Sequence, residues 1–281
     1  MKYNIEIIIS CYNEEKSIGI LYKRIIDSIK LSKKIKKYKL IYIEDNSTDK
    51  TKKNIQRLIK KDKNIKLISL DKRIGKANGL QLGFENIEKN SDLVFMMDAD
   101  LQDDPKEFDR FIKKIEEGYD IVSGYKKNRL DNIEKKIASK IYNKIVNFLF
   151  GMNLHDHNCG FKCFKYEVIK KIHIYDHLHR FIAVICKYNG FSVGEIEVEH
   201  HKRKYGKSKY GFSRYLIGIK DIIRMKYILS VKKIKLNVLI NIAIFMIGIL
   251  LYKYVLIPLI IYLIIYLWLV YNYHKYYRIN N

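Results

Sequence analysis

The chain has 281 residues, of which 48% are apolar and 30% are charged. This length and apolar content suffice for one large domain with a buried core and a smaller appendage, and they exclude an intrinsically disordered protein. The formal net charge of +24 indicates an anionic partner, which can be nucleic acid, a phospholipid surface or a phosphorylated substrate.

The first 123 residues alternate short apolar runs with helical stretches. The predicted strands are 5–9, 39–43, 65–70, 93–97 and 120–123, and the helices between them are 14–29, 49–60, 76–88 and 105–117. This alternation is typical of an α/β fold with a mostly parallel sheet that helices cover on both faces. Ligands of such sheets bind at the carboxyl ends of the strands, so the polar residues that follow the strands are candidate site residues.

The fourth predicted strand ends in the acidic segment DADLQDDP, residues 98–105. Alternation along an extended chain puts Asp98 and Asp100 on one side, where both can hold a hard divalent cation that also binds a substrate diphosphate. An Asp pair after a strand is also typical of a turn and a helix cap, and Asp104 with Pro105 suits that role. A glycine-rich dinucleotide turn and a Walker loop are both missing, which favours a metal-bound diphosphate and a nucleotide-activated donor.

The cysteines and the N-terminus bear on the cellular compartment. The four cysteines, at positions 11, 159, 163 and 186, have neither the density nor the spacing of a disulfide framework or a zinc ribbon. The first ten residues lead directly into a strand, so no signal peptide is expected. These features predict reduced thiols and a cytoplasmic catalytic part.

The C-terminal part combines a basic run with two apolar segments. Between His200 and Lys235 there are twelve Lys or Arg residues and one acid, Asp221. Segment 212–233 is predicted as an amphipathic helix on an anionic leaflet, and 236–252 and 254–273 as two transmembrane helices of a membrane anchor, 234–281. The flanking lysines and arginines place both ends of this anchor in the cytoplasm. One long buried helix kinked at Pro258 is the alternative.

Six motifs, in order along residues 4–225, resemble those of family 2 glycosyltransferases, and specifically the polyprenyl-phosphate and dolichyl-phosphate hexosyltransferases. They are residues 10–15, 44–51 (EDNSTDKT), 73–79, 98–105, 156–164 (DHNCGFKCF) and 201–211 (HKRKYGKSKYG). The resemblance implies a GT-A nucleotide-sugar-binding fold over 1–211. The predicted C-terminal pair of spans matches the subgroup that glycosylates undecaprenyl phosphate.

The resemblance also assigns residues to roles. It implies that Mg²⁺ or Mn²⁺ is held by Asp98, Asp100 and Gln102, and that Asp156 lies near the sugar, where it orients the sugar or acceptor or acts as a base. The predicted nucleotide-sugar contacts are Ser10, Tyr12, Glu14, Asp45 and Lys76. The predicted contacts of the acceptor phosphate are Arg129, Arg203, Ser208 and Lys209. Family members usually have Pro where Ser10 and Cys11 stand and Asp where Glu44 stands, which leaves the choice between uridine and guanosine open.

The expected activity is transfer of a hexose, with inversion, from a UDP- or GDP-linked donor to a polyprenyl phosphate at the cytoplasmic face of the inner membrane. The expected partners are the donor, the lipid phosphate and the anionic membrane surface. Nucleic acid is not expected, because the densest basic run adjoins the apolar segments. A saccharide or protein acceptor is the alternative, a non-enzymatic basic binding protein is a remote one, and the sugar and the oligomeric state stay open.

A further helix is predicted over 133–150. Apolar residues recur at helical spacing at positions 133, 137, 141, 145, 148 and 149, and the helix ends before Gly151. Such a face suits either the protein core or an apolar wall for a prenyl chain. The core is the favoured interpretation.

Overall fold

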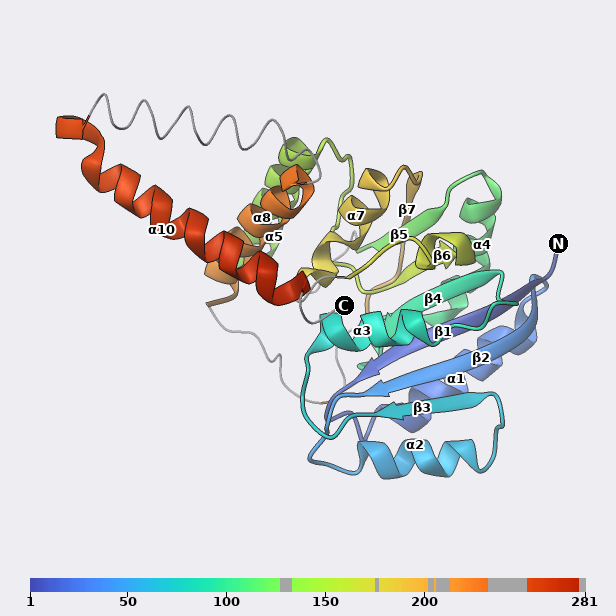
Figure 1. The fold of residues 1–281 in the computed structure, drawn as a ribbon. Helices are drawn as coiled ribbons and strands as arrows, with labels where there is room; N and C mark the ends of the chain where they lie inside the picture. The colour runs from blue at the N-terminus through green and yellow to red at the C-terminus, as the bar shows by residue number, and fades with distance from the viewer. Residues whose placement is uncertain (127–132, 175–176, 202–204, 206–212, 232–251, 278–281) are drawn as a thin grey trace. The chain divides into compact units, whose positions relative to one another are not determined.

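The computed structural model describes residues 1–126, 133–174, 177–201, 205, 213–231 and 252–277. The chain divides into two compact units, Met1–Lys209 and Tyr210–Asn281. The first unit contains the sheet and the helices that pack on it (Figure 1). The described part of the second unit contains two long helices.

The sheet of the first unit has seven strands in the order β3-β2-β1-β4-β6-β5-β7. The strands are β1 (Tyr3–Cys11), β2 (Ile35–Glu44), β3 (Ile65–Ser69), β4 (Leu93–Asp98), β5 (Ile121–Tyr125), β6 (Lys162–Lys165) and β7 (Val193–Glu197). Neighbouring strands are parallel except at β6, which runs antiparallel to β4 and β5. The predicted mostly parallel α/β sheet is therefore confirmed, and β6 and β7 are additions that the sequence pattern did not predict.

Helices cover both faces of the sheet because the inner strands are apolar on both sides. Alternate β1 residues Ile5, Ile7 and Ile9 lie in one core cluster with buried residues of α1 (Ile18–Leu31), α2 (Thr51–Ile59) and α4 (Phe108–Glu116). The opposite side of β1 packs on α3 (Lys76–Glu85), where a Cβ added to Gly83 would lie 2.8 Å from Cγ2 of Ile8. The missing side chain lets α3 approach the sheet closely.

Shorter helices complete the first unit. They are η1 (Pro105–Glu107), α6 (Tyr166–Ile169), η2 (Leu178–Phe181) and α7 (Ile182–Tyr188). Asp104 caps η1, since its Oδ1 accepts a hydrogen bond of 3.1 Å from the Lys106 main-chain N–H, and Pro105 is the first residue of the helix. The cap predicted from sequence at Asp104 is thus confirmed.

The predicted helix over 133–150 is present as α5 (Ile133–Phe150). It packs through Val146 and Phe150, which are buried. Four of the six residues at helical spacing that were expected in the core are instead exposed, at positions 137, 141, 145 and 148. The core interpretation is wrong for these four residues, because the helix turns a different side, with Asn143, Val146 and Phe150, toward the rest of the unit.

The second unit consists of α8 (Ser213–Val231) and α10 (Tyr252–Tyr277) as far as it is described. The predicted amphipathic helix falls on α8, and the second predicted span, 254–273, falls within α10. The first predicted span, 236–252, lies outside the described residues except for Tyr252. Over the part of the chain that the structure describes, no helix combines the length and the apolar character that crossing a membrane requires.

Candidate functional site

The carboxyl ends of three neighbouring strands meet at one edge of the sheet. Ser10 of β1 pairs in register with Asp98 of β4, and Cys11 pairs with Glu44 of β2. The Asp45 main-chain N–H then donates a 3.0 Å hydrogen bond to the carbonyl oxygen of Cys11. The polar residues that follow these strands are therefore neighbours, as the parallel arrangement predicts.

Asp98 is the centre of the charged contacts at this edge. The Lys76 ammonium lies 2.5 and 2.7 Å from its two carboxylate oxygens, and the Ser10 hydroxyl donates a 3.0 Å hydrogen bond to Oδ1. Burial by itself would raise the pKa of Asp98, but the charge and hydrogen bonds of Lys76, with Lys126 and Ser10, lower it to about 2. The carboxylate is therefore ionised at neutral pH and already holds a cation.

Asp45 fixes the loop that delivers Lys76 to this position. Its Oδ1 and Oδ2 accept hydrogen bonds of 2.7 and 3.1 Å from the main-chain N–H groups of Ile74 and Gly75. Gly75 has φ +84°, a left-handed conformation that favours glycine, and α3 begins at the next residue, Lys76. The turn thus places the first side chain of α3 against Asp98.

An aromatic and cationic pair lies beside this loop. The Arg73 guanidinium carbon lies 4.0 Å from the centre of the Tyr12 ring, and its Nε lies 3.9 Å from Oδ2 of Asp45. Four of the five predicted nucleotide-sugar residues, Ser10, Tyr12, Asp45 and Lys76, are thereby linked through a chain of contacts. Arg73 joins them as a residue that the prediction named only within its motif.

Glu14, the fifth predicted nucleotide-sugar residue, takes part in the turn before α1. Its main-chain N–H donates a 2.8 Å hydrogen bond to Thr51 Oγ1, and its Oε2 accepts one of 2.8 Å from Ser17 Oγ. These bonds connect the end of β1 to the first residue of α2. The nucleotide contact assigned to Glu14 stays a prediction.

The predicted metal ligands Asp100 and Gln102 follow β4 in a sharp turn. Leu101 between them has φ +66°, and the Gln102 main-chain N–H donates a 3.1 Å hydrogen bond to Asp100 Oδ1. The Gln102 side-chain nitrogen lies 3.0 Å from Nε2 of His200. Carboxylate and amide oxygens are the donor types that Mg²⁺ and Mn²⁺ prefer, so the donor chemistry of Asp98, Asp100 and Gln102 fits a divalent ion.

Three residues near these acids were not predicted from the sequence: Lys126, His200 and His179. Lys126 follows β5 and its Nζ lies 3.3 Å from Asp103 Oδ1. Burial by itself would lower its pKa, but the charges of Asp103, Asp98 and Asp100 among others raise it. The sequence did contain a signal for Lys126, since it is a polar residue that follows the fifth strand, as the candidate site residues follow the first four.

His179 lies in η2, which adjoins α3. Its Nδ1 is buried and has no hydrogen-bond partner among the described residues. Burial, with the neighbouring charge of Lys76, lowers its pKa to about 3, so the ring is neutral at pH 7. The sequence offered no signal for His179 or His200, since neither stands in a ligand pattern.

Asp156 lies in a buried segment close to Asp98. Its side chain accepts a 2.9 Å hydrogen bond at Oδ1 from the Asn158 main-chain N–H, while Oδ2 is buried with no partner in the described part of the chain. A Cβ added to Gly160, at the end of this segment, would lie 2.8 Å from Asp98 Oδ2 and 3.5 Å from Lys76 Nζ. The segment thus passes directly over the Asp98 and Lys76 pair.

The Gly160 contact yields a first prediction. Gly160→Ala is expected to displace Asp98 or Lys76 and to lower turnover by about a hundredfold, because ångström-scale misplacement of a site is that costly. Gly19→Ala in α1 is the matched control, since a Cβ there meets nothing within 4 Å and alanine stabilises a helix by up to about 1 kcal/mol. Initial rates and thermal unfolding of both variants test this, and a fully active Gly160→Ala enzyme would contradict it.

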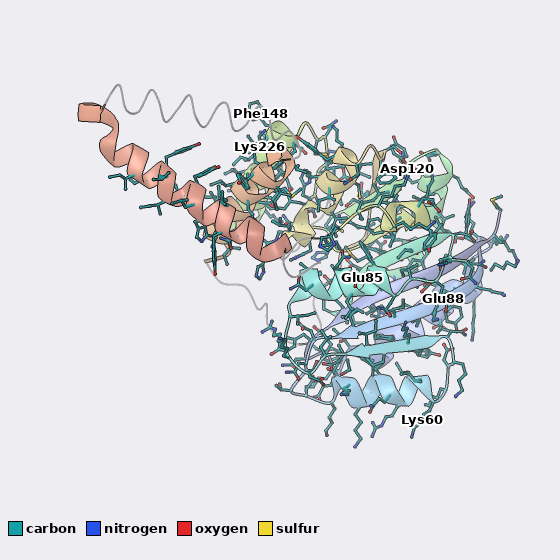
Figure 2. All side chains as sticks on the ribbon, in the orientation of Figure 1. Lys60, Glu85, Glu88, Asp120, Phe148 and Lys226 are labelled. Carbon is teal, nitrogen blue, oxygen red and sulfur yellow. The ribbon has the colours of Figure 1, made fainter. Side chains whose placement is uncertain are left out.

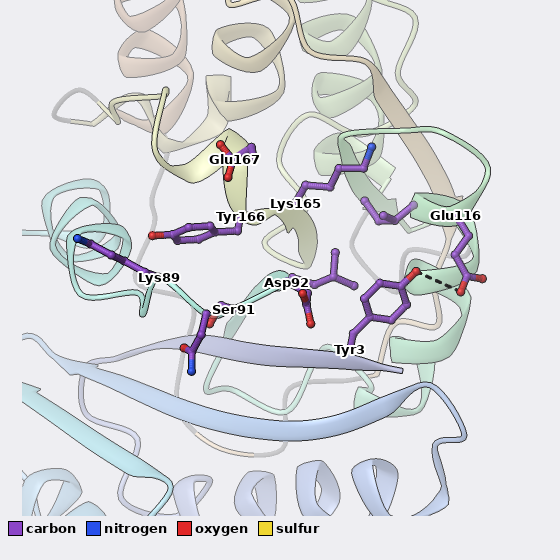
Figure 3. Close-up of a pocket in the computed structure, with 11 residues that line it drawn as sticks. Tyr3, Lys89, Ser91, Asp92, Glu116, Lys165, Tyr166 and Glu167 are labelled. Atoms are coloured by element: carbon purple, nitrogen blue, oxygen red, sulfur yellow. Dashed lines mark hydrogen bonds between the residues drawn. The ribbon is translucent and has the colours of Figure 1, made fainter. Parts of the chain in front are cut away.

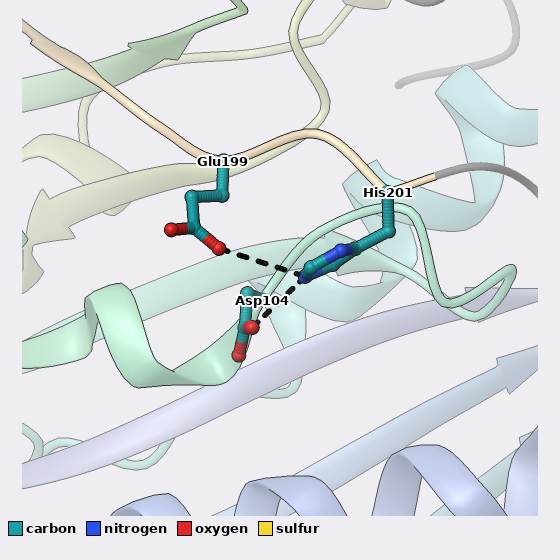
Figure 4. Close-up of side chains that lie close together, drawn as sticks. All are labelled: Asp104, Glu199 and His201. Atoms are coloured by element: carbon teal, nitrogen blue, oxygen red, sulfur yellow. Dashed lines mark hydrogen bonds and ion pairs between the residues drawn. The ribbon is translucent and has the colours of Figure 1, made fainter.

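Asp104, Glu199 and His201 form a second group of potential metal ligands beside the Asp98 loop (Figure 4). His201 Nε2 lies 2.9 Å from Asp104 Oδ2 and 4.0 Å from Glu199 Oε2. The His201 main-chain N–H also donates a 3.1 Å hydrogen bond to the Gln102 carbonyl oxygen. These contacts fix the chain at His201, the first residue of the predicted basic motif, against the loop after β4.

The predicted acceptor residues Arg129, Arg203, Ser208 and Lys209 lie outside the described residues. The described residues next to them, Lys126 and His201, contact Asp103 and Asp104. These two described residues therefore adjoin the loop after β4.

A shallow hollow of about 480 Å³ lies elsewhere on the first unit (Figure 3). It is lined by Tyr3 and Leu93, where β1 and β4 begin, and by Lys165, where β6 ends. Asp98 stands at the other end of β4, so this hollow is separate from the charged site.

Comparison with known proteins places the chain in a family. Residues 6–173 match the family model "Glycosyl transferase family 2". The chain belongs to this family. The sequence prediction of a family 2 glycosyltransferase is thereby confirmed, and the matched range includes Asp98, Asp100 and Asp156.

Similar curated proteins have names that share one kind of acceptor. An undecaprenyl-phosphate 4-deoxy-4-formamido-L-arabinose transferase of Shewanella sediminis is 32% identical over 79% of this chain and 68% of its own length. The enzyme of the same name from Photorhabdus laumondii is 30% identical over 78% of this chain and 66% of its own length. A dodecaprenyl-phosphate galacturonate synthase of Rhizobium johnstonii is 29% identical over 81% and 68%. The chain spans about two thirds of the length of these relatives.

Solved structures share the fold. Glucosyl-3-phosphoglycerate synthase from Mycobacterium tuberculosis, in complex with Mn²⁺, UDP-Glc and phosphoglyceric acid, superposes with a TM-score of 0.60 at 15% identity over 80% of each chain. A mannosyltransferase from Pyrobaculum calidifontis, in complex with GDP-Man and Mn²⁺, has a TM-score of 0.56 at 16% identity over 83% of this chain and 65% of its own. At these identities the likeness shows the fold alone.

Proposed function

We propose that this family 2 enzyme transfers a sugar from a nucleoside diphosphate donor to a polyprenyl phosphate. The observation that carries the proposal is the ionised, partly buried Asp98, paired with the Lys76 ammonium at the carboxyl ends of β1 and β4, where α/β sheets bind their ligands. The names of the curated relatives, all polyprenyl-phosphate sugar transferases or synthases, support the acceptor.

Asp98, Asp100 and Gln102 would hold Mg²⁺ or Mn²⁺, which neutralises the departing diphosphate when it is bound. Lys76 contributes positive charge on the same side, since its ammonium already contacts both oxygens of Asp98. Ser10, Tyr12, Glu14 and Asp45 bind the nucleotide in this proposal. The contact between Tyr12 and Arg73 supports it, because a base can stack beside the ring and guanidinium planes.

The acceptor needs cations more than it needs a strong base. A phosphate monoester carries close to two negative charges at neutral pH and is already a nucleophile. Arg129, Arg203 and Lys209, with Ser208 as a neutral donor, would neutralise it as it approaches the diphosphate. The contacts of Lys126 and His201 beside the Asp98 loop support this assignment, because each stands next to one of the two basic segments.

Asp156 orients the sugar or the acceptor in this proposal. Its Oδ2 is buried and is left without a partner within the described residues, which suits a group that accepts a hydrogen bond from a bound hydroxyl. Gly160 brings the same segment against Asp98 and Lys76.

The reaction takes place at the cytoplasmic face of the inner membrane in this proposal. In this proposal the C-terminal apolar segments 236–252 and 254–273 and the helix α8 associate with that membrane. The apolar composition of both segments and the exposed Ile261, Ile264 and Leu267 of α10 support the assignment.

A pair of basic residues provides the test of the acceptor site. The variant Arg203→Ala/Lys209→Ala is expected to raise the KM for lipid phosphate about tenfold or more, because charge-assisted phosphate contacts are lost, while nucleotide-sugar binding stays unchanged. Lys52→Ala/Lys53→Ala, on the exposed side of α2, is the matched control. Steady-state kinetics with both substrates varied measures the effect. Unchanged acceptor kinetics would exclude this assignment.

A further inference from the structure

An apolar stripe runs along the outer side of α5. Ile137 and Ile141 are each 54% exposed, Ile145 is 41% exposed and Phe148 is 87% exposed. Spacings of four, four and three residues put all four side chains on one face of the helix. Phe148 lies at the outer surface of the first unit (Figure 2). Four large exposed apolar side chains in one row indicate an interaction surface.

Lysines accompany this stripe along one edge. Lys136, Lys140 and Lys144 are exposed, and each stands one residue before an isoleucine of the stripe. They therefore form a parallel row beside the apolar one. Residues 136–150 contain no Asp or Glu, so nothing on this part of the helix offsets the three positive charges.

The inner side of α5 holds the segment that carries Asp156. Asn143 Nδ2 donates a 2.7 Å hydrogen bond to the His155 carbonyl oxygen, and Asn147 Nδ2 donates one of 2.8 Å to that of Leu154. The Leu154 main-chain N–H returns a 3.1 Å bond to Asn147 Oδ1. The outer face of α5 is therefore at the protein surface, while its inner face, one helix diameter away, holds the segment that carries Asp156.

We propose that the outer face of α5, formed by the four apolar residues and the three lysines, docks on an anionic phospholipid surface. An amphipathic helix with lysines beside its apolar face matches the boundary between acyl chains and anionic headgroups. A second copy of the same face would bring like charges together, which disfavours that occupant. The proposal rests on the proposed function, because a polyprenyl phosphate acceptor requires that the site approach a membrane.

Docking through α5 sets the depth of the site. Because Asn143 and Asn147 hold the chain beside Asp156, a helix fixed at the headgroup level fixes this carboxylate relative to the lipid phosphates. This contact belongs to the first unit and orients that unit itself.

A tryptophan placed in the stripe tests the docking. The full chain carrying Ile145→Trp in a Trp268→Phe background is reconstituted in vesicles of anionic phospholipid with brominated acyl chains. Trp268 is the only native tryptophan, so the signal reports position 145 alone. Quenching is expected to exceed that of a Leu31→Trp control by about threefold or more, because interfacial helices bury their apolar face into the acyl boundary. Leu31 ends α1 and is 78% exposed.

Charge reversal of the lysines tests the electrostatic part of the docking. Adding Lys140→Glu/Lys144→Glu is expected to remove most of the quenching at position 145, whereas Lys52→Glu/Lys53→Glu on α2 leaves it unchanged. Equal quenching at positions 145 and 31 overturns the proposal. Emission that is unquenched but shifts with protein concentration also overturns it, in favour of a second copy.

The quenching experiment and the assay for a lipid-linked sugar can give independent results. An unquenched position 145 in an enzyme that still forms a lipid-linked sugar removes the docking surface and keeps the function. Strong quenching without a lipid-linked product keeps the docking surface and removes the function.

Discussion

Asp100→Asn is expected to lower divalent-dependent turnover by at least about a hundredfold, because a metal at the diphosphate supplies several kcal/mol of charge stabilisation. The substitution is nearly isosteric and keeps an oxygen that can accept the hydrogen bond from the Gln102 main-chain N–H. The loss should therefore come from the missing negative charge. Asp100 is only 8% exposed, so an anion from the solvent cannot take the place of the missing carboxylate charge.

The measurement is the initial rate as a function of Mg²⁺ and Mn²⁺ concentration. The variant should need more metal for half-maximal rate as well as showing a lower maximum. Asp27→Asn on the exposed side of α1 makes the same change of charge and should behave as the unaltered enzyme does. An Asp100→Asn enzyme with full rate and unchanged metal dependence would show that Asp100 does not hold the ion.

The second large effect is expected at Asp156. Asp156→Ala should lower kcat by about a hundredfold or more, since catalytic and orienting carboxylates commonly contribute that much. Asp156→Asn should recover a large part of the rate, because its Oδ1 can still accept the hydrogen bond from the Asn158 main-chain N–H while its Nδ2 donates one to the oxygen of a bound hydroxyl. We expect this recovery because the acceptor phosphate is already a nucleophile at neutral pH, so that Asp156 is not needed as a base.

Single-turnover rates and their pH dependence distinguish an orienting group from a base. Recovery by Asn with an unchanged pH profile supports orientation. If Asn is as impaired as Ala, Asp156 acts as the base and the orienting role is wrong. Retained circular dichroism and unfolding temperature in both variants ensure that the losses arise in the site.

The sheet and its ligand edge could be predicted because they depend on local patterns. Five strands and the helices between them follow from apolar runs separated by polar turns, and the rule for parallel sheets then places Ser10, Asp45 and Asp98 at one edge. The strand β6 escaped prediction because it is four residues long and antiparallel within a parallel pattern. No local signal distinguishes such a strand from a loop.

The partners within the site depend on tertiary packing. Lys76 stands 22 residues before Asp98 and meets it only because α3 approaches β1 closely at Gly83. His200 meets Gln102 from 98 residues away. Periodicity shows that one side of α5 is apolar, but it does not say what covers that side, which is why the core interpretation of Ile137 and Ile141 was wrong.

The central claim is sugar transfer to a polyprenyl phosphate. The full chain in membranes is incubated with undecaprenyl phosphate and labelled UDP- or GDP-linked sugars, with Mg²⁺, with Mn²⁺ and with a chelator. The account predicts an organic-extractable, acid-labile labelled product that forms only with a divalent ion and disappears in Asp100→Asn. Label that enters only a water-soluble saccharide, or only protein, with every donor that is used would contradict it.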